Sequence, residues 1–257
     1  MGGTVGGLDT PIETRSRVDG IADRLITAIA VGEYLPGSRL PSERELAASL
    51  QVGRMTVRAA ISHLVDQGLL RTQRGRGGGS FVQEHLPATV LSASRPSVHR
   101  TLGSQWELLQ DTCEAIAHLQ GTVCRAAAEN RSEHDIAVLE ERLEAFRAAG
   151  SGLESQKADE QFHLAICSAA HNLTLSTLLL DLEARVSISA PKHPWGEAEG
   201  MREMEARSLR DHEKLVAAIR SGHGAEAGEL GRNHARIDLE LLEDALRRAG
   251  HGAIPAG

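Results

Sequence analysis

The stretch from Ser42 to Val82 constrains the fold of this chain more than any other part of the sequence. It begins with an S-x-x-E pattern at Ser42 and Glu45, in which each side chain caps the backbone of the other residue and starts a helix. A tight turn at residues 51–53 ends that helix, and a further helix begins at Arg54. Two helices joined by so short a turn are typical of a helix-turn-helix.

The elements on either side complete a winged helix-turn-helix over residues 17–84. Apolar residues at helical spacing predict a first helix that stops near Gly32. Short β runs at 69–73 and 80–82 follow the third helix and enclose a glycine-rich hairpin tip at 74–79. The apolar residues that predict the first and third helices are Val18, Ile21, Leu25, Ile29, Val57, Ile61 and Leu64.

Positive charge is concentrated in this part of an acidic chain. The 257 residues carry 28 Lys and Arg against 35 Asp and Glu, a formal net charge of −7. Between Arg39 and Arg76, however, seven arginines stand against three acidic residues. A local basic patch indicates a polyanion that binds at this place only, with a solvated arginine surface as the alternative.

The arginines of the third helix and the hairpin are the candidate DNA contacts. Specific DNA readers place the first turns of a recognition helix in the major groove, where the arginine fork matches the acceptor pair of guanine. Arg54, Thr56 and Arg58 occupy those turns, and Arg44 lies on the preceding helix within reach of a base or a phosphate. Glycines at the hairpin tip let the backbone approach a groove closely. The arginines beside them are Arg71, Arg74 and Arg76.

The remainder of the chain is predicted to be helical. Proline and serine are frequent and periodicity is lost over residues 85–103, which predicts a linker, and residues 1–16 are predicted to be a flexible tail. An all-helical domain follows over 104–249. Its helices are expected near 104–129, 133–149, 153–170, 173–189, 201–221 and 225–248. The fold class is therefore mainly α: a winged helix-turn-helix with a small β-hairpin wing, then an all-α bundle.

Cysteine usage and hydropathy predict a cytoplasmic protein with no membrane contact. The three cysteines form no CxxC pair and are typical of buried thiols in a reducing compartment, and the N-terminus has no secretory signal pattern. The 20 uncharged residues from Gln161 to Leu180 have the length of a membrane span. Eight polar side chains among them favour a buried helix pair instead.

Four residues of the helical part form a candidate metal site. Asp159 and His163 are four positions apart and share one helix face. His212 and His234 lie on apolar stripes, each eleven positions from the turn at His223, so an antiparallel helix pair brings them to one level. The alternative for each histidine is a core residue with a hydrogen-bond partner. Three imidazoles beside a buried carboxylate with no nearby cation favour a divalent metal: zinc first, with nickel, iron and manganese also suited.

The sequence from Val18 to Val82 resembles the DNA-binding domain of the GntR family of bacterial transcription regulators. The shared motifs are G-x-x-x-P-G-x-x-L-P-S-E-R-E-L-A, then V-x-R-x-T-V-R, then G-L-L and G-x-F-V. Gly53 stands where the family often has a serine or threonine, and it removes a hydroxyl that could contact a phosphate. The resemblance implies DNA contacts by Arg44, Arg54, Thr56, Arg58, Arg74 and Gly75.

Residues 102–246 resemble the FCD effector domain of the FadR-type branch of that family. The motif D-x-x-x-H, a later histidine and a final histidine occur here as Asp159 with His163, then His212, then His234. In the metal-binding members these ligands hold a divalent ion that completes a small-molecule pocket. The resemblance therefore implies a metal cofactor and an effector, which we expect to be an organic acid.

Three further positions bear on the effector. Asn172 matches a family position shortly after the Phe-His pair. Gln110 stands four residues before Glu114, where the family usually has an arginine that holds an effector carboxylate. Arg185 is a candidate substitute for that arginine.

Together these features predict a regulator of transcription and not an enzyme. The resemblance implies a homodimer, and two-fold pairing matches a palindromic operator in double-stranded DNA. We expect a repressor that a small molecule releases from DNA. The alternatives are a regulator for which the metal itself is the signal, a binding protein with a structural metal, and an enzyme whose metal activates water. The enzyme would need a positioned general base, and no HExxH motif is present.

Overall fold

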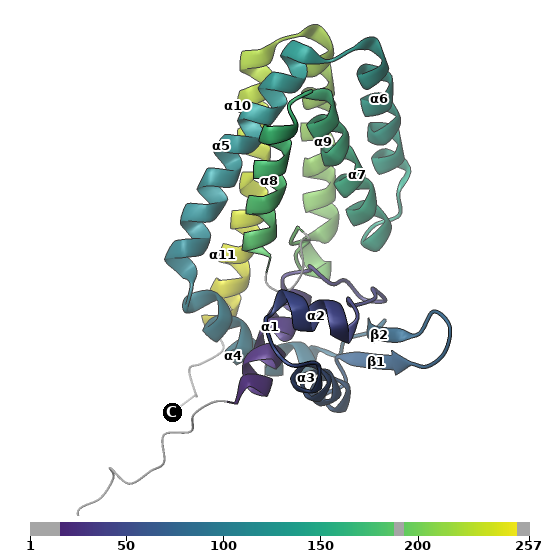
Figure 1. Cartoon of the computed structure of the whole chain (residues 1–257), viewed down its shortest axis with the longest axis vertical. Helices are drawn as coiled ribbons and strands as arrows, with labels where there is room; N and C mark the ends of the chain where they lie inside the picture. Colours follow the sequence, from purple (N-terminus) through teal and green to yellow (C-terminus); the bar gives the residue numbers. More distant parts are fainter. Residues whose placement is uncertain (1–15, 188–192, 251–257) are drawn as a thin grey trace, which may run out of the picture.

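A computed structural model describes residues 16–187 and 193–250 of the chain. A small N-terminal domain lies at one end of a long bundle of helices (Figure 1). Residues 1–15, which belong to the predicted flexible tail, lie outside the described residues. The elements of the N-terminal domain are α1 (Arg17–Ala30), α2 (Glu43–Ser49), α3 (Arg54–Asp66), β1 (Leu70–Gln73) and β2 (Gly79–Val82).

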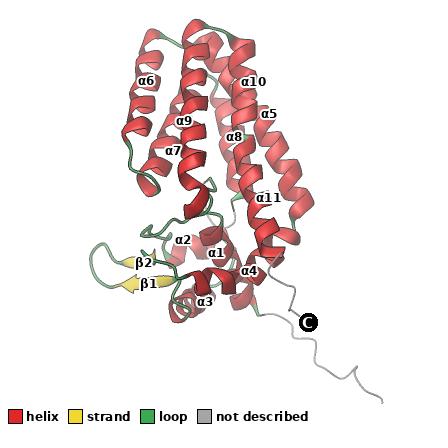
Figure 2. Cartoon of the chain, turned by 180° about the vertical axis from the view of Figure 1, so that it is seen from behind, coloured by secondary structure: helices red, strands yellow, loops and turns green. Residues whose placement is uncertain are grey.

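The N-terminal domain is the winged helix-turn-helix that the sequence predicts. Both halves of the capping box form at α2, because the Glu45 amide donates to the Ser42 hydroxyl at 3.3 Å and the Ser42 amide donates to the Glu45 carboxylate at 2.8 Å. The wing is an antiparallel hairpin in which Leu70 pairs with Val82. Its strands point away from the helices and carry the glycine-rich tip outward (Figure 2). The side chains at the centre of this domain are fully buried: Leu25, Tyr34, Leu46, Val57, Leu64 and Leu70.

The segment predicted as an irregular linker is instead a helix, α4 (Ala88–Gly103). Its buried positions are Ser94, Ser97, Val98 and Leu102, so small polar and apolar side chains share the face that packs. The Ser94 hydroxyl has a hydrogen-bond partner within its own helix, because it donates to a backbone carbonyl there at 2.8 Å. The helix packs against α1, where Arg100 pairs with Asp23 at 2.8 Å, and against the last helix of the bundle. The connection between the domains is therefore a packed element.

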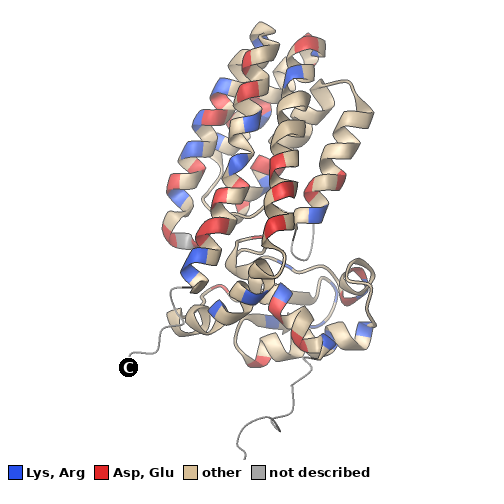
Figure 3. Cartoon of the chain, turned by 90° about the vertical axis from the view of Figure 1, so that its left-hand side faces the viewer, with Lys and Arg blue, Asp and Glu red and all other residues tan. Residues whose placement is uncertain are grey.

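The bundle contains the remaining described helices. A break at Ala235 divides the single helix predicted over 225–248 into two helices, directly after His234. Acidic and basic residues are interspersed along the outer surfaces of the bundle (Figure 3). The bundle helices are α5 (Trp106–Asn130), α6 (Glu133–Ala148), α7 (Leu153–Ala169), α8 (Leu173–Val186), α9 (Ala198–Ser221), α10 (Gly224–His234) and α11 (Arg236–Gly250).

The uncharged stretch from Gln161 to Leu180 falls on α7 and α8, which a turn at His171 separates. The structure thus divides this stretch into the predicted helix pair. Among the described residues, no helix is both long enough and apolar enough to cross a membrane.

Candidate metal centre and DNA-binding surface

The predicted DNA-contacting residues lie on α2, on α3 and at the wing tip, and all except Thr56 are exposed. Arg54 and Arg58 are exposed on the first turns of α3, and Thr56 between them is half-buried. Arg44 is exposed on α2, and Arg74 and Gly75 are exposed at the wing tip. Gly75 has a φ of +100°, a backbone conformation that favours glycine.

Arg58 does not extend freely from α3. Its guanidinium donates to both carboxylate oxygens of Glu43 on α2, with an Nη2–Oε2 distance of 2.7 Å. The same contact lowers the pKa of Glu43. Met55, which sequence analysis did not single out, is 70% exposed on the same turn of α3. An exposed apolar side chain at this place can contact a thymine methyl group, and its exposure is the signal that marks it.

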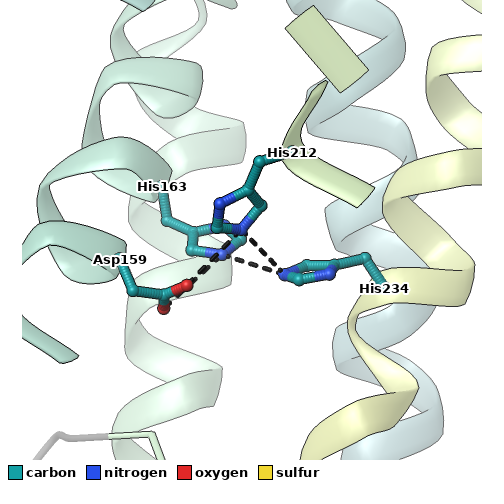
Figure 4. A group of neighbouring side chains, drawn as sticks. All are labelled: Asp159, His163, His212 and His234. Carbon is teal, nitrogen blue, oxygen red and sulfur yellow. Dashed lines mark hydrogen bonds and ion pairs between the residues drawn. The ribbon is translucent and has the colours of Figure 1, made fainter. Parts of the chain in front are cut away.

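The structure brings together the four candidate metal ligands from three helices (Figure 4). Asp159 and His163 lie on α7, His212 lies on α9, and His234 is the last residue of α10. The α9–α10 turn at Gly222, with a left-handed φ of 72°, folds the two helices against each other. One ligand atom from each residue lies within 4.8 Å of every other.

The four side chains point their ligand atoms at one common point. The Nε2 atom of His234 lies 3.2 Å from that of His163 and 3.3 Å from that of His212. The Asp159 carboxylate oxygens lie 3.4 Å from His212 Nε2 and 3.7 Å from His163 Nε2. Nitrogens bound at about 2.1 Å to one ion are about 3.0 Å apart in octahedral and about 3.4 Å apart in tetrahedral geometry. The observed nitrogen separations lie between these values, so the donor set fits a divalent ion.

The outer nitrogen of two of the three imidazoles has a polar neighbour, as is usual for metal-binding histidines. His234 Nδ1 lies 3.4 Å from a carboxylate oxygen of Asp211. His163 Nδ1 lies 3.2 Å from the side-chain amide nitrogen of Gln120, and turning this amide over gives Nδ1–H an oxygen acceptor. His212 is fixed by packing instead. Phe162 stacks on its ring at a centroid distance of 4.1 Å, and Phe146 contacts it edge-on at 4.8 Å.

Burial sets the protonation of this group. It lowers the pKa of His163 and of His212 well below the ordinary value, and the neighbouring His234 adds to both shifts. It also raises the pKa of Asp159 to about 6. The His163 and His212 rings are therefore neutral at pH 7, which is the form of imidazole that binds metals.

A cavity of about 330 Å³ opens directly beside the four residues, and Asp159 and His163 form part of its wall. His193 faces it from the segment before α9, next to Glu183 of α8 and Asp238 of α11. Its Nδ1 atom lies 2.7 Å from an Asp238 carboxylate oxygen, and its Nε2 atom lies 3.9 Å from Glu183. Burial opposes the charged imidazolium, but the carboxylates outweigh it and raise the pKa of His193 to about 10.

The three residues that the sequence proposes for the effector do not belong to the wall of this cavity. Gln110 lies half-buried near the start of α5, while Gln120 of the same helix lines the cavity. Asn172 caps α8, where its side-chain oxygen accepts from the Leu175 amide at 3.1 Å. Arg185 is exposed at the end of α8.

Sequence reasoning missed His193, Glu183 and Asp238. They come from three separate segments, and only the packing of those segments makes them neighbours. The only feature of the sequence that could have pointed to His193 is its place in the proline- and glycine-containing break between two helices.

Comparisons with known proteins identify the two domains of the chain. Residues 17–81 match the gntR family of bacterial regulatory proteins, and residues 111–236 match the FCD domain. The Uxu operon transcriptional regulator of Escherichia coli K12 is 37% identical over 72% of this chain and 71% of its own length. The Glc operon transcriptional activator of the same strain is 27% identical over 94% of each chain. The solved structure of a GntR protein from Streptococcus agalactiae is 22% identical, covers 90% of this chain and 99% of its own, and has a TM-score of 0.41.

The family and these relatives are transcription regulators. The winged helix-turn-helix supplies the DNA-binding part and the helical bundle the effector part. The chain therefore belongs to the GntR family of bacterial DNA-binding transcription regulators, in the group that carries an FCD domain.

Proposed function

We propose that this chain is a cytoplasmic, homodimeric repressor whose affinity for its operator is set by an organic acid bound beside a divalent metal ion. The observation that supports this most directly is the set of four converging ligand atoms, of which those of Asp159 and His163 belong to residues in the wall of a cavity of about 330 Å³. A metal site that opens onto a cavity can present free coordination positions to a ligand, whereas a structural site is closed.

Asp159, His163, His212 and His234 would hold the ion. Three nitrogens and one carboxylate oxygen suit zinc first, and nickel, iron or manganese also accept such a set. When bound, the ion supplies positive charge and coordination positions for an effector's oxygens. The protein's own part is to fix the ligands: Phe162 and Phe146 hold the His212 ring, and Asp211 and Gln120 orient the other two rings.

The cavity also has its own positive groups for an acid. His193 is an imidazolium at neutral pH, since its pKa is raised to about 10, and Lys157 lines the cavity at its exposed side. We infer that His193 and Lys157, and not Arg185, contact an effector's carboxylate in this cavity. The His193 ring lies 6.0 Å from that of His163 between centroids, so one carboxylate-bearing molecule can reach both.

Dimerisation follows from the DNA-binding mode. One winged helix-turn-helix reads only a short half-site, and two-fold pairing of two copies matches a palindromic operator. In this arrangement Arg54, Thr56 and Arg58 enter the major groove, Arg44 contacts the adjacent backbone, and the wing around Arg74 and Gly75 lies along the duplex. We infer repression relieved by the effector.

The experiment that tests this function combines metal analysis with operator binding. The purified protein is analysed for metals, and its affinity for a selected operator is titrated with bound metal, after chelation, and with added organic acids. Relief of binding by an acid only in the metal-loaded protein supports the proposal. A response to metal with no response to any acid favours the metal itself as the signal. Unfolding of the bundle on chelation alone favours a structural metal.

A further inference from the structure

The cavity beside the metal ligands is not enclosed by the effector domain alone. Glu33 lines it, and this residue belongs to the α1–α2 loop of the DNA-binding domain. Glu33 is 2% exposed, and its amide donates to the Ala28 carbonyl at 2.8 Å, so the loop is firmly held at the end of α1. The wall around a molecule in the cavity therefore includes a residue of the DNA-binding domain.

Backbone hydrogen bonds join this loop to the segment that carries His193. The amides of Trp195 and Gly196 both donate to the Val31 carbonyl, each at 3.0 Å. The side-chain amide of Gln156, on α7, donates to the Gly32 carbonyl at 2.9 Å and to the His193 carbonyl at 3.3 Å. We call this contact, formed by residues 31–35, residues 193–196 and Gln156, the interdomain joint.

The two segments of the joint approach so closely that position 32 needs glycine. Gly32 has a φ of +81°, and a Cβ atom at this position would lie 2.7 Å from the Gly196 carbonyl oxygen. Gly196 has a φ of +74°, and a Cβ there would lie 3.0 Å from the Leu241 side chain. The two backbones therefore approach more closely than any side chain would allow.

An apolar contact runs from the joint to the metal ligands. Leu35 of the α1–α2 loop packs in one buried cluster with Trp195 and with Phe146 of α6. Phe146 in turn contacts the His212 ring at 4.8 Å between centroids. Both the cavity wall and a candidate metal ligand thus reach the same loop of the DNA-binding domain.

We propose that the effector site lies between both domains, with Glu33 in its wall, and that the interdomain joint transmits occupancy of the metal site beside the cavity to the DNA-binding domain. This inference rests on the proposed function in taking the cavity as the effector site. A ligand that moves His193 also moves the His193 carbonyl, to which Gln156 donates. It moves the amides of Trp195 and Gly196 as well, which donate to the Val31 carbonyl. Because α1 packs directly against the recognition helix α3, a displaced loop reorients that helix.

Hydrogen exchange of the full-length protein tests the joint with Zn²⁺ as the only added probe. The key variant is Gly32→Ala, which forces the two backbones apart. Its matched control is Gly68→Ala, because Gly68 has the same left-handed conformation, with a φ of +75°, and open space around its Cβ position. Gln156→Leu is the second variant, in case Gly32→Ala does not fold. Exchange is followed at residues 31–35 and 195–197, and zinc content is measured in parallel.

Without metal, Gly32→Ala and Gln156→Leu should speed exchange at residues 195–197, in the other domain, by about tenfold, and Gly68→Ala should not. With Zn²⁺, exchange at residues 31–35 should slow in the wild type and in Gly68→Ala, and this response should be lost in both joint variants. Unchanged exchange at 195–197 in the joint variants overturns the joint. Bound zinc without slower exchange at 31–35 in the wild type overturns the transmission. Failure to bind zinc contradicts the proposed metal site, while the metal-free comparison still decides the joint.

Discussion

The Nε2 atoms of His212 and His234 lie 3.3 Å apart, although the two residues belong to consecutive helices. Both rings are buried. Two such nitrogens face each other at this distance only if one carries a proton or if a cation lies between them. The Nε2 atom of His163, 3.2 Å from that of His234, meets the same condition, which favours one shared cation.

Removal of this pair should abolish metal binding. We expect about one divalent ion per subunit in the wild type and none in the variant with both His212→Ala and His234→Ala, because two of four ligands are lost. His171→Ala is the matched control, since His171 is an exposed histidine that binds Asp135 at 2.7 Å outside the site. Elemental analysis gives the result. Full metal content in the double variant, with the DNA-binding domain still folded, would reject the four-ligand site.

The sequence alone located this pair for a simple physical reason. Both histidines are eleven positions from His223, and an antiparallel helix hairpin places equidistant residues at one level. Asp159 and His163 follow from the helix repeat in the same way. The winged helix-turn-helix could also be predicted from the sequence, because capping boxes and glycine turns depend only on residues a few positions apart.

The features that the sequence did not predict depend on tertiary packing. The helix α4 buries Ser94 and Ser97 beside Val98 and Leu102, so serines interrupt the apolar pattern along its packed face. The acidic and cationic groups of the cavity wall come from α8, α11 and the segment before α9, and no local pattern relates them. Gln110 was chosen by its place in a family motif, whereas the orientation of α5 turns Gln120 toward the cavity.

Metal affinity should fall in acid because Asp159 must lose a proton to bind. Burial raises the pKa of Asp159 to about 6, so below this pH the metal has to displace that proton. Each pH unit below about 6 should cost about a factor of ten in affinity from this group. The Asp159→Asn variant should bind zinc more weakly, and its affinity should lack the part of the pH dependence that comes from Asp159. Competition titrations from pH 5 to pH 8 measure both slopes. Equal slopes in the two proteins would contradict the role of Asp159.

Arg58→Ala should weaken specific DNA binding and leave stability almost unchanged. Its ion pair with Glu43 is exposed, and exposed ion pairs contribute little to folding. A lost bidentate base contact costs about 1–3 kcal/mol at the specific site. Arg125→Ala on α5 is the control, since Arg125 is an exposed arginine that pairs only locally with Glu129. Fluorescence titration with operator and with unrelated DNA gives the two affinities. Unchanged operator affinity would exclude Arg58 from base recognition.

The wing arginines should strengthen DNA binding through their charge and should not contribute to the recognition of a particular base sequence. Arg74→Ala combined with Arg76→Ala should weaken binding to all DNA sequences by a similar factor, because both side chains are exposed at the tip and suit phosphate contacts. The slope of log affinity against log salt should become shallower by about two. Titrations at several salt concentrations provide that slope. Selective loss of operator binding at an unchanged slope would assign these arginines to base contacts.

Coupling between the effector and DNA should be reciprocal. A ligand shifts the protein between DNA-competent and DNA-incompetent states only by its difference in affinity for the two, and such coupling is typically about 1–3 kcal/mol. Operator DNA must therefore weaken effector binding by the same factor by which the effector weakens DNA binding. Calorimetry of an organic acid that relieves DNA binding, with and without operator, measures one side of this equality, and a DNA titration measures the other. In the variant with both His212→Ala and His234→Ala, the effector should no longer change DNA affinity, because this variant lacks the metal that holds the effector. An acid whose affinity ignores both the operator and the metal would show that the cavity and the recognition helix are not linked through this site.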